Sequence, residues 1–222
     1  MSAGAATRGR ARRARAAFPV VVAAPSGTGK TTVCREVVER DPGIVFSVSH
    51  TTRPPRAAER DGVDYHFVTS EEFQRMVADD AFLEWAVYND CEYGTSWASI
   101  DAPLASDVDV LLEIEVQGAR QVRERRPDAR FIFLLPPSMS ALRARLERRG
   151  TDSEAQIERR LELASRELEA IHVFDYAVVN EELETCVRNV LEILEGERRG
   201  EQQTLRRRFA TGAALERLQG AG

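Results

Sequence analysis

The segment that most constrains this chain is Ala-Pro-Ser-Gly-Thr-Gly-Lys-Thr, residues 24–31. A continuous apolar run precedes it, and a helical pattern follows it. Lys30 is the single lysine among 31 Lys and Arg residues. A compact ammonium on a flexible stem fits inside a tight backbone loop, where a planar guanidinium does not. A strand, a glycine-rich turn, Lys-Thr and a helix, in this order, are the pattern of a phosphate-binding loop.

The loop has the groups that phosphate binding needs. Gly27 and Gly29 let the backbone N–H groups turn inward, and the helix that follows adds its positive N-terminal end. We expect Lys30 to reach the β- and γ-phosphates of a nucleoside triphosphate, and the Thr31 hydroxyl to ligate Mg²⁺ together with waters. Ala24 stands where this pattern usually has glycine, and its methyl group is tolerated only if φ is negative there.

Length, charge and cysteine spacing narrow the class of protein. A chain of 222 residues with 43% hydrophobic content suits one domain with an insertion or a lid. The net charge of −5 gives no reason to expect a nucleic-acid partner. Cys34, Cys91 and Cys186 lie far apart, which is typical of a reduced cytoplasmic protein without structural zinc or disulfides. No apolar run approaches about 18 residues, so no membrane span is expected.

The two ends differ from the middle of the chain. Residues 1–17 are rich in arginine and alanine and contain no acid, and we interpret them as a disordered basic extension. A targeting peptide is the alternative. Residues 197–222 are interpreted as a polar C-terminal tail, with a short helix around 205–218.

Strand and helix patterns alternate along most of the chain. Strand-like runs occur at residues 19–24, 44–49, 64–69, 108–114, 130–135 and 176–180. Helical patterns occur at residues 30–40, 70–79, 117–125, 138–149, 153–171 and 182–196. This rhythm predicts an α/β fold, a P-loop NTPase parallel sheet flanked by helices. Residues 44–100 interrupt it, and we expect an inserted small α+β subdomain there, between core segments 18–43 and 101–196.

The helical segment 138–171 is dense in charge. Most of its arginines are explained as a solvated face with salt bridges to Glu158, Glu162 and Glu167. This explanation covers Arg145, Arg149 and Arg160 less well.

Residues 47–95 contain a candidate acceptor site. Arg53 and Arg56, held between prolines, present guanidinium forks suited to a phosphate dianion. A carboxylate such as Glu84 can accept the two adjacent N–H donors of guanine, which adenine lacks, and such a mismatch discriminates strongly when buried. The alternative is that Glu84 faces solvent while Leu83 and Trp85 face the core, as strand alternation favours.

The combination of motifs resembles the guanylate kinases, which transfer the γ-phosphoryl of ATP to GMP. The resemblance covers residues 18–196 and includes the phosphate loop followed by these further segments: Ser-Val-Ser-His-Thr-Thr-Arg, Asp-Tyr-His-Phe, Phe-Leu-Glu-Trp-Ala, Tyr-Gly-Thr, Leu-Glu-Ile-Glu-Val-Gln-Gly-Ala, Pro-Pro-Ser and Arg-Arg-Gly-Thr.

This resemblance implies roles for individual residues. It implies that ATP is bound by Ala24, Pro25, Ser26, Gly27, Thr28, Gly29, Lys30, Thr31, Thr32 and Asn180. It implies that the GMP phosphate is held by Ser49, Arg53, Arg56, Tyr65 and Tyr93, and that guanine is recognised by Glu84, Thr95 and Glu115. Glu113 and Glu115 occupy the acidic end of a strand near the metal and the acceptor base. The catalytic set is then Lys30, Arg53, Arg145, Arg149 and Arg160, with residues 138–171 as a helical lid.

Two departures from the family pattern affect the expectation. Glu115 replaces the usual aspartate and is one methylene longer, and Ala58 replaces a glycine that often follows the second phosphate-binding arginine. Two alternatives remain open: a kinase of the same fold with another acceptor, and a catalytically silent module that uses the GMP cleft to bind phosphorylated peptides. The sequence leaves monomer and homo-oligomer equally open.

Overall fold

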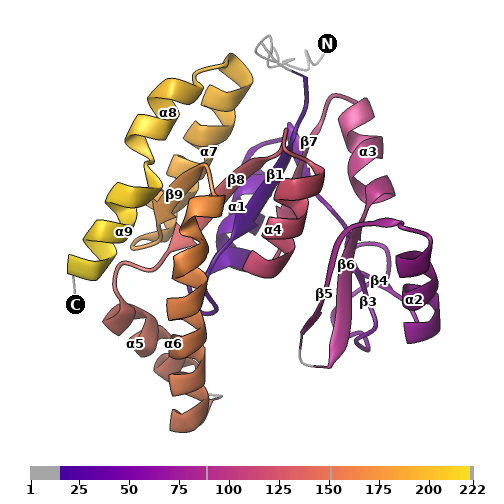
Figure 1. The fold of residues 1–222 in the computed structure, drawn as a ribbon, viewed down its shortest axis with the longest axis horizontal. Helices are drawn as coiled ribbons and strands as arrows, with labels where there is room; N and C mark the ends of the chain where they lie inside the picture. The colour runs from indigo at the N-terminus through magenta and orange to yellow at the C-terminus, as the bar shows by residue number, and fades with distance from the viewer. Residues whose placement is uncertain (1–15, 89, 151, 221–222) are drawn as a thin grey trace, which may run out of the picture.

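The structure is a computed structural model, and it describes residues 16–88, 90–150 and 152–220. Its centre is a five-stranded parallel sheet, sheet A, with the strand order β2-β7-β1-β8-β9. The bounds of these strands are Pro19–Ala23 for β1, Ile44–Phe46 for β2, Asp109–Glu113 for β7, Arg130–Leu135 for β8 and Tyr176–Val179 for β9. Figure 1 shows sheet A in the middle of the molecule.

A second sheet, sheet B, lies to one side of sheet A (Figure 1). Its strand order is β4-β3-β6-β5, and β3–β6 and β5–β6 are antiparallel. The strands run over His50–Thr51 for β3, His66–Phe67 for β4, Phe82–Tyr88 for β5 and Cys91–Ser96 for β6. Helix α2, Ser70–Ala78, belongs to this unit, and α3, Trp97–Ala105, returns the chain to β7. Sheet B lies within residues 44–100, and it is mixed, because β3 and β4 pair in parallel.

Helices cover both faces of sheet A. Because side chains alternate along β1, Val20 and Val22 pack in one apolar cluster, and Val21 and Ala23 pack in another. The first cluster includes residues of α1 (Lys30–Arg40) and α7 (Leu183–Arg199), and the second includes residues of α3, of α4 (Val116–Arg125) and of the 3₁₀ helix η1 (Glu169–Val173). Burial on both faces explains why the sequence of these strands is apolar without alternation.

Helices α5 (Met139–Arg149) and α6 (Glu154–Leu168), the helical pair, project beyond sheet A (Figure 1). They share a small apolar cluster of their own, formed by Leu142, Leu146, Ile157 and Ala164. No described helix is both long and apolar enough to cross a membrane.

The structure corrects one boundary. Strand β2 pairs with β7 in sheet A, with Ile44 opposite Asp109, so it belongs to the core and not to the insertion. The apolar run at residues 44–49 ends as a strand at Phe46, and the chain then crosses to sheet B at His50. The insertion therefore begins after Phe46.

The segment interpreted as a polar tail is instead folded against the core. It forms α8, Gln202–Arg208, and α9, Thr211–Gly220. Leu205 and Phe209 join the cluster that contains α1, whereas Ala214 and Leu218 join the cluster that contains α4. The turn between the two helices meets the edge of β9, where the Ala177 N–H donates to the Phe209 carbonyl at 3.0 Å. In α8 and α9, the few apolar residues lie four positions apart among many arginines, as in the pairs Leu205–Phe209 and Ala214–Leu218. This spacing gives an apolar face.

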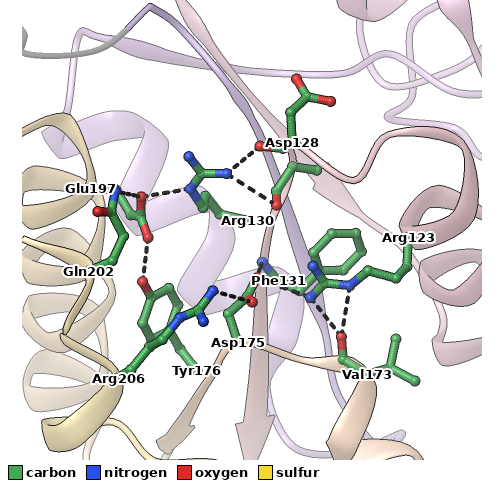
Figure 2. Close-up of polar contacts among 11 residues, drawn as sticks. Arg123, Asp128, Arg130, Phe131, Val173, Asp175, Tyr176, Glu197, Gln202 and Arg206 are labelled. Atoms are coloured by element: carbon green, nitrogen blue, oxygen red, sulfur yellow. Dashed lines mark hydrogen bonds and ion pairs between the residues drawn. The ribbon is translucent and has the colours of Figure 1, made fainter. Parts of the chain in front are cut away.

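Polar contacts anchor the start of this tail (Figure 2). The Glu197 side chain is 1% exposed and pairs with Arg130 at 2.6 Å. It also accepts hydrogen bonds from the Tyr176 hydroxyl and from Gln202. Arg206 of α8 reaches Asp175, immediately before β9, at 3.3 Å. Strands β8 and β9 are thus linked to the tail by buried, hydrogen-bonded charge. Residues 1–15, which include most of the expected basic extension, lie outside the described residues.

The tail is expected to contribute to global stability. Leu205→Ala should lower the free energy of unfolding by about 2–5 kcal/mol, because it opens a cavity at a fully packed position. Leu205 is 3% exposed, whereas Leu163, the matched control, is 42% exposed. Leu163→Ala should cost less than about 1 kcal/mol. Urea denaturation measures both variants, and equal, small effects would contradict an integral tail.

Candidate active site

The phosphate loop joins β1 to α1 at the carboxyl end of sheet A. Gly27 and Gly29 have φ values of +94° and +97°, which glycine adopts without strain. Ala24 does not share this conformation: the non-glycine residues with positive φ in the described chain are Asp80, Asp90 and Asp107. The methyl group at the first position of the loop is therefore compatible with the turn. The loop closes where the Thr28 N–H donates to the Pro25 carbonyl at 3.1 Å.

Lys30 is held by the end of β7. Its Nζ donates to the Ile114 carbonyl at 2.8 Å and to Glu115 Oε1 at 3.0 Å. The Thr31 hydroxyl donates to Glu113 Oε1. Parallel pairing of β1 with β7, with Val22 opposite Glu113, brings these groups to the same edge. Burial by itself would lower the pKa of Lys30, but Glu115 and Glu113 outweigh it and the pKa is raised.

A pocket of about 440 Å³ opens beside the loop. Its lining consists of Gly27, Thr28, Gly29, Thr32, Arg145, Arg148, Asn180, Glu181 and Leu183. Asn180 follows β9 and donates from Nδ2 to the Thr28 carbonyl at 2.7 Å. The position expected to contact the donor base therefore lies directly against the loop. Arg148 was not expected here from the sequence, although its spacing of three from Arg145 places both on one face of α5.

The three arginines expected in the lid have different surroundings. Arg145 donates to the Thr28 carbonyl at 3.1 Å and to the Asn180 carbonyl at 2.7 Å, so α5 is fastened to the loop. Arg160 pairs with Asp152 at 3.1 Å. Arg149 ends α5, and its side chain lies outside the described part of the structure. The structure thus brings Arg145 to the loop, and the phosphate contacts expected of all three stay predictions.

The two arginines of the acceptor site lie between β3 and β4. Arg53 donates to both oxygens of Glu59, at 2.8 and 2.9 Å. Its guanidinium lies 5.5 Å from the ring centre of Tyr65, which is 6.1 Å from the ring centre of Tyr93. The Arg56 side chain is 77% exposed, and its guanidinium lies 4.0 Å from Glu59. The Glu59 carboxylate, which was not expected here from the sequence, is therefore the negative charge beside the guanidinium groups of both Arg53 and Arg56.

Glu84 is a buried carboxylate in sheet B. It is 5% exposed and accepts a hydrogen bond of 2.6 Å from the Thr95 hydroxyl, which lies 3.2 Å from the Ser49 hydroxyl. Burial raises the pKa of Glu84, against the lowering effect of the Thr95 hydrogen bonds. A Cβ at Gly118 of α4 would come within 2.4 Å of Glu84 Oε2, so glycine is required for this close approach.

The alternative in which Glu84 faces solvent is wrong. Strand β5 has a bulge between Phe82 and Glu84, opposite Ser96 and Thr95 of β6. Because a bulge inserts one residue, it breaks strict alternation. Phe82, Leu83 and Glu84 are consequently all buried.

The end of β7 joins the two halves of the site. The charges of Lys30 and Glu115 act on Glu84. On the other side, burial and then the charge of Glu113 raise the pKa of Tyr65. The Glu113–Ile114–Glu115 segment therefore lies between the donor loop and the acceptor-side residues Glu84 and Tyr65.

Glu167, in the last turn of α6, also lies in the site. It was expected on a solvated face, but its side chain is half-buried, and the charges of Glu115 and Lys30 act on it. Its Oε2 is buried without a hydrogen-bond partner. Burial, with the charge of Glu115, raises the pKa of Glu167 to about 7. The buried residues of α6 include Ala164 and Leu168, and Glu167 directly precedes Leu168.

Oxygen donors at the loop fit a hard divalent cation. The Thr31 hydroxyl and the Glu113 carboxylate lie in contact beside the phosphate-binding backbone. Within residues 16–88, 90–150 and 152–220, no group of three or more His, Cys, Asp and Glu residues could hold a metal ion alone. This arrangement suits Mg²⁺, which keeps several waters and is held by one or two protein oxygens together with substrate phosphates.

Two substitutions test the loop geometry. Gly29→Ala should lower the free energy of unfolding by about 1–2 kcal/mol through strain at positive φ. It should also weaken binding of an ATP analogue, because the new Cβ would lie 2.8 Å from Asn180 Nδ2. Ala24→Gly is the control, and it should change the stability by less than about 1 kcal/mol and leave analogue affinity unchanged. Urea unfolding and calorimetric titration measure both properties, and similar losses in the two variants would contradict this geometry.

Comparison with known proteins agrees over the same region. The family described as guanylate kinase matches residues 16–197. The guanylate kinase of Latilactobacillus sakei subsp. sakei is 49% identical over 181 residues, which are 80% of this chain and 88% of that protein. The guanylate kinase of Carboxydothermus hydrogenoformans is 42% identical over 198 residues, 89% of this chain and 97% of that protein.

A solved structure gives the same result. The crystal structure of guanylate kinase from Anaplasma phagocytophilum matches with a TM-score of 0.68 and 31% identity, over 85% of this chain and 89% of that one. The family match spans the phosphate loop, both sheets and the helical pair without interruption. The chain therefore belongs to the guanylate kinase family.

Proposed function

We propose that this protein transfers the γ-phosphoryl group of ATP to GMP, and to dGMP, with ADP and the nucleoside diphosphate as products. One observation carries the proposal: the phosphate loop and the buried carboxylate of Glu84 lie on the two sides of the Glu113–Ile114–Glu115 segment. This arrangement places a triphosphate and a hydrogen-bonding base on the two sides of one site. The proposed role is recycling of GMP in the cytoplasm.

On the donor side, the loop backbone and Lys30 bind the ATP phosphates. For this, the Lys30 ammonium exchanges Glu115 for phosphate oxygens, and its raised pKa keeps it charged. Bound Mg²⁺, with Thr31 and waters as ligands, would neutralise charge on the β- and γ-phosphates. Asn180 and Arg145 brace the loop from the pocket side.

On the acceptor side, the GMP phosphate replaces Glu59 between Arg53 and Arg56. Tyr65 and Tyr93 lie beside Arg53 and offer hydroxyl groups to the same phosphate. A bidentate guanidinium–phosphate contact is short and charge-assisted, and it fixes orientation as well as affinity.

Guanine is recognised in the pocket beneath. Ionised Glu84 accepts from N1–H and from the 2-amino group, while Thr95, Ser49 and Glu115 complete the polar wall. Adenine has no donor at N1 and no 2-amino group, so it would leave the buried carboxylate unpaired at a large cost.

Transfer itself needs positioning and charge neutralisation more than covalent chemistry. Phosphoryl transfer passes through a loose transition state, and an oxygen of the GMP phosphate attacks in line. Closure of the helical pair would bring Arg149 and Arg160 towards the γ-phosphoryl and exclude water. No covalent enzyme intermediate is required.

An acceptor panel tests the function directly. ADP formation from ATP and Mg²⁺ is measured with GMP, dGMP, AMP, CMP or UMP, and fast turnover should be confined to the two guanine nucleotides. Lys30→Ala, the control, should lower kcat by at least ~100-fold through lost stabilisation of transition-state charge. Turnover with other bases would indicate a different acceptor. No turnover at all would favour a silent binding module, and a folded Lys30→Ala variant with near-normal kcat would refute the donor-site assignment.

Glu84→Gln tests recognition of the base separately. The amide keeps the size of the side chain but can no longer accept both guanine donors, so KM for GMP should rise by roughly 10-fold or more. KM for ATP should change much less, because Glu84 lies in sheet B, on the other side of the Glu113–Ile114–Glu115 segment. Steady-state kinetics with each substrate varied in turn measure the two values. Equal effects on both would remove Glu84 from base recognition.

A further inference from the structure

Glu59 occupies the place between the two arginines of the acceptor site. Its carboxylate oxygens accept hydrogen bonds from Arg53 Nη2 at 2.8 and 2.9 Å, and Oε1 lies 4.0 Å from Arg56 Nη1. The Glu59 side chain is only 16% exposed, although it belongs to the loop between β3 and β4. A carboxylate offers guanidinium groups the same kind of charged acceptor oxygens as a phosphate does. Glu59 therefore stands where the proposed function needs the acceptor phosphate.

The backbone fixes this carboxylate as well. The Arg56 N–H donates to Glu59 Oε2 at 2.8 Å, and the Glu59 N–H donates to the Arg56 carbonyl at 3.0 Å. These two hydrogen bonds close the turn from Arg56 to Glu59, so the loop itself sets the position of the carboxylate. The hydrogen bond from Arg53, and then that from the Arg56 N–H, lowers the pKa of Glu59, so the carboxylate is charged at neutral pH.

The Arg53 guanidinium is restrained on its other sides. Its Nη1 donates to the Pro54 carbonyl at 2.7 Å. The guanidinium also lies 5.5 Å from the ring centre of Tyr65 and 5.8 Å from that of Phe67. Because the guanidinium is held in one place, an anion that binds it has to take the place of Glu59 or meet its negative charge at close range.

We propose that Glu59 is a specificity-determining residue of the acceptor site. It fills the subsite of the acceptor phosphate as an internal anion, keeps out small free anions, and yields to a phosphate that is carried by a bound base. This rests on the proposed function, because it takes the acceptor to be a guanine nucleotide.

The selectivity follows from competition for the arginines. Glu59 is attached to the same short loop as Arg56, so it competes at an effective concentration on the order of millimolar or higher. A free phosphate or sulfate ion has to displace it with the arginine contacts alone. GMP also gains the hydrogen bonds between its base and Glu84, which hold its phosphate beside the arginines. Glu59 therefore lowers the affinity for every anion, and only an anion with a base still binds well.

Sulfate binding measures this competition directly. The donor loop, which also binds anions, is first filled with the Mg²⁺ complex of β,γ-imido-ATP, and sodium sulfate is then titrated calorimetrically at constant ionic strength. Glu59→Gln removes the charge but keeps an oxygen acceptor for the Arg56 N–H, so it should bind sulfate about 10-fold more tightly than wild type. Glu71→Gln, the same change of charge at an exposed position of α2, should match wild type.

A double variant locates the bound sulfate. Adding Arg53→Gln to Glu59→Gln removes the guanidinium that the sulfate is expected to contact, so the gain in affinity should disappear. A gain that persists in the double variant would place the sulfate elsewhere and overturn the proposal.

Steady-state kinetics give a second signature. Glu59→Gln should lower KM for GMP by roughly 5–10-fold, because the phosphate no longer has to displace a charged carboxylate. KM for ATP should stay unchanged. Glu59→Ala also takes away the acceptor of the Arg56 N–H, so its KM for GMP should lie above that of Glu59→Gln. A role of Glu59 confined to holding the loop together would raise KM for GMP in both variants.

The outcomes separate the two proposals. Unchanged sulfate affinity in folded Glu59→Gln, or a rise of its KM for GMP, overturns the role of Glu59. Tighter sulfate binding without turnover of GMP contradicts the proposed acceptor and supports the role of Glu59. Failure of the wild type to bind the analogue overturns the proposed donor site. Sulfate affinity is then compared between Glu59→Gln and the double variant, and their difference still decides the role of Glu59.

Discussion

The pairing of β1 with β7 is the constraint on which the site depends. Their parallel register sets Val22 opposite Glu113, so the turn after β1 and the acids after β7 emerge at one edge of sheet A. Lys30 then donates hydrogen bonds to Ile114 and Glu115, and the charges of Lys30 and Glu115 also act on the buried Glu84. A slip of one residue in this pairing would turn the side chains of β1 to the opposite face and separate donor from acceptor chemistry.

The parts of the fold that depend on local pattern were predictable. Strand, loop and helix from Pro19 to Arg40 follow from apolar burial, two glycines and Lys-Thr, and the structure confirms them. Pairing between strands that lie far apart in the chain was harder to predict from the sequence. The end of β2 at Phe46 could not be seen, because the apolar run continues towards sheet B. The bulge at Glu84 could not be predicted, because the strand sequence around it is ordinary. Alternation within one strand does not show which residues of the partner strand lie opposite it.

The site shows the same division. Residues with a distinctive chemical context, such as Lys30, Arg53 and Glu84, could be selected from sequence. Glu59 and Glu167 could not, because glutamates on exposed segments are mostly solvated. Only the tertiary contact with Arg53 distinguishes Glu59, and only the burial of its Oε2 distinguishes Glu167. The apolar positions of α8 and α9 were likewise obscured by the arginines around them. The amino-acid composition of a helix describes all of its faces together, whereas its burial depends on the apolar residues of a single face.

The position of α8 and α9 has a consequence for how the chain is made. Phe209 contributes the backbone acceptor that covers the outer edge of β9, and the two helices then reach opposite faces of sheet A. These residues are translated after every strand of both sheets. Until they leave the ribosome, β9 has an open strand edge that other chains can extend. The nascent domain is therefore most vulnerable to misassembly after its nucleotide loop and both sheets have emerged and before α8 and α9 have emerged.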